Sequence, residues 1–263
     1  MRWRAPLGVV LCGVLGCGQA SEAPRAELTV VIDDAGVLPA TNDLGYTIEL
    51  TEARVVVADI VFTVAGELHT VSHWQRASDL LIKPAFAHPG HSQGGEVTGE
   101  LPGQYVVDWT TNRGQTLGLA TLIAGTYTAA DFVFGRGSEA LGLPPSDPLI
   151  GHTALLRGTA TKSGTSVAFT IVIDSPEGRI LVGAPFDATI EGSTSGQIGF
   201  RFEPNDAEEE DTVFAGLDFL ALDGDGDGIV QIEPGVPEVE EAYNNVRRTF
   251  QTHDHFRFFY QGN

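Results

Sequence analysis

Hydrophobic residues along the chain fall into short runs that have the composition of β-strands. The run from Val167 to Ile173 consists largely of β-branched and aromatic residues, which is typical of a strand with at least one buried face. Turn-forming residues separate such runs at short intervals, as in Ser-Pro-Glu-Gly at 175–178. The other predicted strands are Leu28 to Ile32, Tyr46 to Val64 (two strands or one bent strand), Tyr105 to Thr111, Tyr127 to Phe134, Thr153 to Thr161, Ile180 to Val182, Phe186 to Ile190, Ile198 to Phe202 and His255 to Tyr260.

One segment near the C-terminus has the pattern of a helix instead. Val239, Ala242, Tyr243 and Val246 recur at the spacing that places side chains on one helical face, and the segment Pro237 to Thr249 has acidic residues at its start and arginines at its end. Many short strands with a single helix predict an all-β fold. We expect an antiparallel β-sandwich, or a barrel-like sheet pair, with one C-terminal helix.

The N-terminus has the features of an export signal. Arg2 and Arg4 precede an apolar run, 5–15, that is too short to span a bilayer as a helix. The run ends in Val-Leu-Gly-Cys at 14–17, which resembles the bacterial lipobox; the alternative is a plain signal peptide that contains a cysteine. The resemblance implies a lipidated Cys17 and an extracytoplasmic protein anchored by lipid to a membrane of the bacterial cell envelope. The chain would then divide into a signal peptide, 1–16, a tether, 17–26, and a β-domain, 27–263.

The chain is strongly acidic, with 35 acidic and 15 basic residues. Loss of Arg2 and Arg4 with the signal peptide changes the formal charge from −20 to −22. Such a surface repels nucleic acid, which we exclude as a partner, and attracts cations. Cys17 would be the last cysteine and would carry lipid, so the domain has no disulfide. The acidic run 206–211 is the clearest internal boundary, and we interpret it as a solvated loop.

The segment Asp-Gly-Asp-Gly-Asp-Gly at 223–228 is the most specific chemical feature of the chain. Aspartates at alternate positions, with glycine at the sixth, let three carboxylates converge on one hard cation. The segment resembles the calcium loop of EF-hands and the single-loop sites of dockerin-like and thrombospondin-type modules. It departs from the EF-hand at the twelfth position, which is Pro234, and no entering helix is predicted. The resemblance implies a lone structural Ca²⁺ loop, closed by Glu233 or Glu238; the alternative is a hydrated turn. The candidate ligands are Asp223, Asp225, Asp227, Ile229 and Glu233.

The histidines form two groups with a geometric argument for metal binding. Pro and Gly between His88 and His91 favour a type II turn, which would bring these residues to within about 7 Å. An extended backbone would place His253 and His255 on one face. Imidazole and carboxylate ligands suit Cu(II) or Zn(II). The alternative is that each histidine is a surface or loop residue. The candidate ligands are His69, His73, His88, His91, His253 and His255.

A secreted β-sandwich with few histidines and a nearby tryptophan is similar in outline to the copper-binding proteins linked to methanobactin gene cassettes. That resemblance implies copper bound through histidine, sometimes with an oxidised tryptophan. Only His73, Trp74, His88 and His91 match those parts, and the rest of the chain does not align.

The pentapeptide 90–94 fits G-x-S-x-G and resembles the nucleophile elbow of α/β-hydrolases. A triad would need Ser92, an aspartate such as Asp187 or Asp218, and His253 or His255. The nucleophile must lie between a buried strand and a helix. Pro89 interrupts any such strand, and the Gly- and Pro-rich segment that follows does not favour a helix. The sequence therefore favours a binding protein over an enzyme.

These patterns together predict a lipid-anchored metal-binding protein that takes Cu(II) or Zn(II) through histidines and Ca²⁺ through a structural loop. Its partners would be the membrane and a protein that donates or accepts metal. One alternative is a cell-surface binding or adhesion module without a transition metal. A second alternative is a serine hydrolase that uses Ser92.

Overall fold

The computed structural model describes residues 23–64, 96–206 and 211–262. The described chain is mostly β-strand, as the sequence predicts. The strands are β1 (Arg25–Asp33), β2 (Ala40–Thr41), β3 (Thr47–Val64), β4 (Glu96–Asp108), β5 (Thr116–Ile123), β6 (Gly125–Phe134), β7 (Ala154–Lys162), β8 (Thr165–Ile173), β9 (Ile180–Ile190), β10 (Gly196–Phe202), β11 (Asn205–Asp206), β12 (Asp211–Thr212), β13 (Ile229–Ile232) and β14 (Phe256–Gly262). The helices are η1 (Glu139–Leu141), α2 (Phe219–Leu222), η2 (Pro237–Val239), α3 (Glu240–Phe250) and η3 (His253–His255).

The 18-residue strand β3 pairs with four other strands of the sheet. Its first half pairs with β2 and β7, and its second half pairs with β4 and β6. The ladders to β4 and β6 change register around Asp59, whose φ is 47°. An irregularity of this kind bends a strand, so β3 passes from one region of the sheet into another. Of the two alternatives predicted for Tyr46 to Val64, two strands or one bent strand, the structure has the second.

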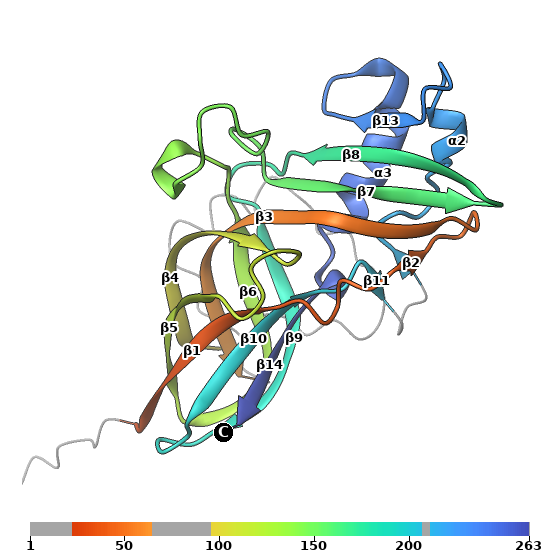
Figure 1. Ribbon diagram of the computed structural model, residues 1–263. Coiled ribbons are helices and arrows are strands. Elements are labelled where there is room, and N and C mark those ends of the chain that lie inside the picture. The colour runs from red at the N-terminus through yellow and green to blue at the C-terminus, as the bar shows by residue number, and fades with distance from the viewer. Residues whose placement is uncertain (1–22, 65–95, 207–210, 263) are drawn as a thin grey trace, which may run out of the picture.

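The twelve-stranded sheet has two regions, which Figure 1 shows one above the other. The open region consists of β13, β8, β7, the first half of β3 and the short strand β2 that pairs with it. The curled region consists of β9, β6, the second half of β3, β4, β5, β1, β10 and β14. Its last strand, β14, comes back beside β9, as all views show.

The expected antiparallel sandwich is not what the sheet forms. β1 pairs with β10, and β8 pairs with β13, in parallel, so the sheet is large and mixed. Each parallel pair is joined by a long connection, as parallel strands require. Hydrophobic periodicity shows where a strand lies but not which strand it pairs with, so the sequence did not reveal these two pairs.

Aromatic rings fill the interior of the curled region. Trp109 lies 5.2 Å from Phe200 between ring centroids, and its indole Nε1 donates to the Phe200 carbonyl oxygen at 2.9 Å. Phe256 packs against Phe132 and Phe202 at 5.3 and 5.5 Å. All five side chains are buried. Because Phe256 is the first residue of β14, these contacts fix the position of the start of β14 and of the η3 turn that precedes it.

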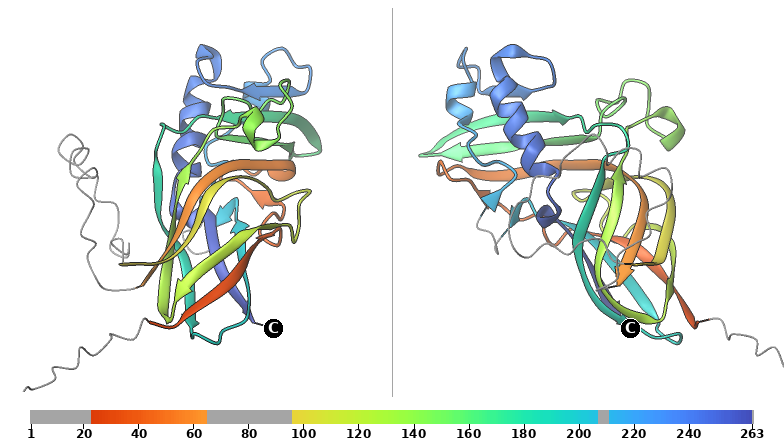
Figure 2. Two further views of the ribbon diagram at one scale, coloured as in Figure 1. Left: turned by 90° about the vertical axis from the view of Figure 1, so that its left-hand side faces the viewer. Right: turned by 180° about the vertical axis from the view of Figure 1, so that it is seen from behind.

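The C-terminal helix lies across one face of β8 and β13 (Figure 2). Its first turn is the 3₁₀ turn η2, and α3 then continues to Phe250. Ala242, Tyr243 and Val246 are buried, which confirms the predicted stripe. None of the described helices has the length and hydropathy needed to cross a membrane.

Several boundaries differ from those predicted. The two short runs at Ile180 and Phe186 join into β9, and the strand β5 was missed. The ends of the acidic run pair as β11 and β12, with Asp206 buried, rather than forming a wholly solvated loop. Each of these strands forms because another strand supplies its hydrogen-bond partners, and local composition does not show where that strand lies.

Candidate functional site

The Asp-Gly loop joins the one-turn helix α2 to the edge strand β13. Asp218 caps α2 by accepting from Ala221 N at 3.3 Å, and the buried ring of Phe219 packs edge-on against Tyr46 at 5.4 Å. The prediction that no helix enters the loop is therefore wrong. A four-residue helix is too short for a periodic pattern, and this one exists because tertiary contacts hold it.

The three loop carboxylates converge. Asp223, Asp225 and Asp227 each offer an oxygen, and these oxygens lie within 4.8 Å of one another. Two ligands placed on opposite sides of a Ca²⁺ ion are about 4.8 Å apart, since Ca–O distances are about 2.4 Å. No other group of three possible metal ligands converges in this way among the residues that the structure describes.

The backbone of the loop supports this arrangement. Asp223 Oδ2 accepts from Gly228 N at 3.1 Å, while Asp223 Oδ1 is shielded from solvent and accepts no hydrogen bond within the described structure. Gly228 has a φ of 79°, a left-handed conformation that glycine adopts without steric cost. The left-handed turn at Gly228 thus brings its N–H to Asp223 Oδ2, and Asp223 Oδ1 is shielded from solvent.

Of the two further predicted ligands, Ile229 is better placed than Glu233. Gly228 O accepts from Ala168 N at 2.8 Å, so by strand alternation the N–H and C=O of Ile229 point away from β8. The N–H of Ile229 donates to Asp227 Oδ1 at 2.8 Å, on the side of the loop. Glu233 is not among the convergent group, so it would have to move to close the site.

Most of the predicted histidine ligands lie outside the described residues. This applies to His69, His73, His88 and His91, together with Trp74, Ser92 and the lipidation site Cys17.

The extended conformation expected for His253 and His255 is wrong. Both residues belong to the 3₁₀ turn η3, since the chain must turn between Phe250 at the end of α3 and Phe256 at the start of β14. His253 pairs through Nδ1 with Asp254 and is partly exposed. His255 is completely buried and has different neighbours.

The His255 ring lies between a backbone carbonyl and a carboxylate. Its Nδ1 is 2.9 Å from the Glu203 carbonyl oxygen, and its Nε2 is 3.8 Å from Asp211 Oδ1. Burial raises the pKa of the Asp211 carboxyl, and the nearby carboxylates of Asp206 and Asp254 raise it further, while His255 opposes them. Sequence reasoning missed Asp211 because β12, which carries it, is a two-residue strand.

The nucleophile named for a hydrolase triad, Ser92, lies outside the described residues, so the triad stays a prediction, but two of its other named residues, Asp218 and His255, have partners in the described structure. Asp218 accepts from the Tyr46 hydroxyl at 2.5 Å, which lowers the pKa of the Asp218 carboxyl. His255 Nδ1 lies 2.9 Å from the Glu203 carbonyl oxygen, and its Nε2 faces Asp211. Asp218 is thus bonded to Tyr46, and His255 to the Glu203 carbonyl, in place of each other.

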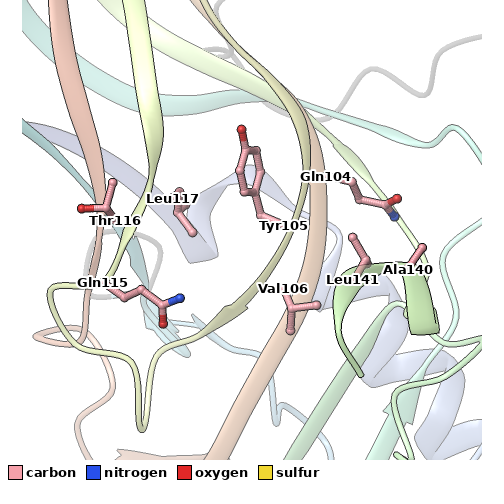
Figure 3. Close-up of a pocket in the computed structure, with 8 residues that line it drawn as sticks. All are labelled: Gln104, Tyr105, Val106, Gln115, Thr116, Leu117, Ala140 and Leu141. Atoms are coloured by element: carbon pink, nitrogen blue, oxygen red, sulfur yellow. The ribbon is translucent and has the colours of Figure 1, made fainter. Parts of the chain in front are cut away.

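A hollow of about 340 Å³ opens between β4 and β5 (Figure 3). The two strands pair at Gly99–Leu122 and Glu100–Thr121 and then separate, because β4 follows β3 and β5 follows β1. No lining side chain is charged. The lining residues are Gln104, Tyr105, Val106, Gln115, Thr116, Leu117, Ala140 and Leu141.

Three features thus stand out in the described chain: the Asp-Gly loop, the His255–Asp211 pair and the hollow between β4 and β5. The first was visible in the sequence as a motif. The His255–Asp211 pair joins segments that are far apart in the chain. The hollow lies between consecutive strands, but it depends on the pairing of β4 with β3 and of β5 with β1, which no local pattern reveals. No protein-family model matches this chain, and no curated protein or solved structure matches it either.

Proposed function

We propose that the protein is a lipid-anchored, extracytoplasmic domain that binds a divalent cation, Ca²⁺, at the Asp-Gly loop. The observation that carries this proposal is the convergence of the oxygens of Asp223, Asp225 and Asp227 to within 4.8 Å. The shielded Asp223 Oδ1, which accepts no hydrogen bond in the described structure, supports it independently. A bare carboxylate oxygen out of contact with water is costly, and a bound cation removes that cost.

The role of the ion would be structural. The loop connects α2, whose Phe219 is in the core, with β13, which forms the edge of the open region next to α3. Without a cation, the three carboxylates repel one another and loosen this connection. With Ca²⁺ bound, the loop links the helix to the sheet edge, and metal affinity adds to the stability of the fold.

Calorimetry and thermal unfolding of the purified protein test the proposal. Ca²⁺ at about a hundredfold above Kd should stabilise the protein by about 2.7 kcal/mol, which corresponds to a rise in Tm of roughly 5–10 °C. Asp225→Asn should abolish both Ca²⁺ binding and the rise. Asp187→Asn removes an equal charge from an exposed position on β9 and should change neither. An unchanged Tm at millimolar Ca²⁺ would rule the proposal out.

A transition-metal function through His69, His73, His88 and His91 stays a prediction from the sequence. Elemental analysis of protein purified without a histidine tag tests it. Copper or zinc that disappears when His88 and His91 are both replaced by alanine would support it, and metal-free protein would contradict it.

The hollow between β4 and β5 favours a second candidate function, a cell-surface binding module for an uncharged polar ligand. The amide of Gln115 and the hydroxyl of Thr116 offer both donors and acceptors, Gln104 offers its amide oxygen while its Nε2 donates to Arg136 O at 3.2 Å, and no charged side chain lines the space. A neutral sugar has this chemistry. Saturation-transfer NMR with glucose, galactose and N-acetylglucosamine tests the idea: a signal that is lost in Gln115→Ala supports it, and no signal from any of the three rejects it.

A further inference from the structure

The buried ring of His255 has a defined tautomer when it is neutral. Its Nδ1 lies 2.9 Å from the Glu203 carbonyl oxygen, which can only accept, so Nδ1 carries the hydrogen and donates it. Nε2 is then left with a lone pair. Metal-bound histidines almost always donate their other ring N–H to a carbonyl or carboxylate in this way, which orients the ring and makes the ligand nitrogen more basic.

The Nε2 lone pair faces a second acceptor. Asp211 Oδ1 is 3.8 Å away, which is too long for a hydrogen bond. Both atoms are shielded from solvent, and neither has a hydrogen-bond donor in the described structure. Two buried acceptors that face each other are unfavourable unless a positively charged species lies between them.

The surrounding charges reinforce this preference. The charged groups that act on Asp211 are His255 itself, Asp206 of β11 and Asp254 of η3. Two arginines, Arg201 and Arg257, pair with the side chain of Glu203 at 3.3 and 3.9 Å. The carboxylates of Asp206 and Asp254 therefore add negative charge beside Asp211, while Asp254 also pairs with His253.

We propose that His255 Nε2 and the Asp211 carboxylate form the core of a second metal site, which takes a divalent transition ion of the Zn²⁺ type. One imidazole with carboxylates suits Zn²⁺ rather than Ca²⁺, which prefers oxygen ligands alone. Two ligands of a tetrahedral Zn²⁺ lie about 3.4 Å apart, so the observed 3.8 Å must close by a few tenths of an ångström.

The coordination would be completed by Asp206 or Asp254. Neither carboxylate lies within 4.8 Å of both donor atoms in the described structure, so binding must be accompanied by movement of one of these side chains. The ion can approach from the side of Asp211, whose side chain is 40% exposed, while His255 forms the buried wall. This site shares no residue with the Asp-Gly loop, so either can fail without the other.

Nitrogen-detected NMR of the histidine rings tests the site directly. The full protein, purified without a histidine tag, is kept in excess Ca²⁺ and titrated with Zn²⁺, and the His255 ring is assigned through its own backbone. One equivalent of Zn²⁺ should shift the Nε2 resonance of His255 while Nδ1 keeps its proton. Because the readout is specific to His255, zinc bound by other histidines does not obscure it.

The partly exposed Asp211 supplies the decisive variant, since replacing His255 in the core would risk unfolding the protein. Asp211→Asn keeps the shape of the side chain and should weaken Zn²⁺ binding at His255 at least tenfold. The Tm in the absence of zinc should not fall, because the amide can donate to Nε2 where the carboxylate cannot. Asp225→Asn should keep the zinc-induced shift while it loses Ca²⁺ binding. The proposal is overturned if Zn²⁺ leaves Nε2 unshifted, or if the shift is the same in Asp211→Asn. A proton on Nε2 at neutral pH that excess Zn²⁺ does not displace would also overturn it.

Discussion

Tyr46 and Asp218 join the start of the long strand β3 to the helix that leads into the Asp-Gly loop. The Tyr46 hydroxyl donates to Asp218 Oδ1 at 2.5 Å and accepts from Leu220 N at 3.0 Å. The ring itself is buried, and burial is the main cause that raises the pKa of its hydroxyl. One side chain therefore fixes both the cap and the first turn of α2.

Tyr46→Phe should loosen α2 without disturbing the core, since only the hydroxyl is lost. We expect a loss of about 1 kcal/mol in the free energy of unfolding and weaker Ca²⁺ binding, because Asp223 ends this helix. Urea unfolding and calcium calorimetry measure the two effects. Tyr105→Phe removes a hydroxyl that bonds Pro102 O, far from the loop in the fold, and should leave Ca²⁺ affinity unchanged. Equal affinity in wild type and Tyr46→Phe would show that the loop does not depend on α2.

Two glycines of the loop should respond differently to alanine. Gly228 has a φ of 79° and has open space around its Cα, so Gly228→Ala should cost about 1 kcal/mol through its backbone conformation alone and should weaken Ca²⁺ binding. Gly224 also has open space but no left-handed φ, so Gly224→Ala should be nearly neutral. Calorimetry with Ca²⁺ compares the pair. Similar losses in both variants would contradict the left-handed turn at Gly228.

Asp147 anchors the connection between η1 and β7 to β3. Its carboxylate accepts from both terminal nitrogens of Arg54, at 2.8 and 3.0 Å, and both side chains are largely buried. Asp147→Asn removes the charge and should cost about 1–3 kcal/mol, because it leaves the buried Arg54 with a weaker partner. Chemical unfolding at neutral pH measures the loss, and Glu139→Gln in the exposed turn η1 is the matched control.

The same pair should give the protein a specific acid sensitivity. The hydrogen bonds from Arg54 lower the pKa of the Asp147 carboxyl below its ordinary value of 3.8. A group whose pKa is lower in the folded protein stabilises the fold above its unfolded pKa, and this contribution is lost as the pH falls through the folded pKa. The stability of the wild type should therefore fall more steeply below about pH 4 than that of Asp147→Asn. Parallel pH profiles of the two proteins would contradict this.

Trp109 tests the aromatic interior. Trp109→Phe removes the Nε1 bond to Phe200 O and part of the buried ring, and we expect a loss of roughly 2–3 kcal/mol. Thermal unfolding measures it. Phe259→Leu, at a partly exposed position of β14, should cost less than half as much. The cost matters for function because the Trp109 cluster includes Phe256, which follows His255 directly.

The candidate calcium site was predictable from the sequence because its ligands are neighbours in the chain. Alternate aspartates and a glycine at the sixth position define the loop wherever it occurs, and the structure brings Asp223, Asp225 and Asp227 together as the motif predicts. The helix α2 was not predictable, because a single turn carries no periodic pattern and depends on Tyr46, which lies 173 residues before Phe219 in the chain.

Local patterns also determined most strands and the C-terminal helix, since burial of one face imposes a repeat on the sequence itself. Only the tertiary structure decided the pairing of β1 with β10 and the meeting of His255 with Asp211. These relationships join segments that are remote in the chain, and their free energy comes from packing and hydrogen bonds between them. A sequence records the repeat that each segment needs in order to be buried, but not the partner against which it is buried.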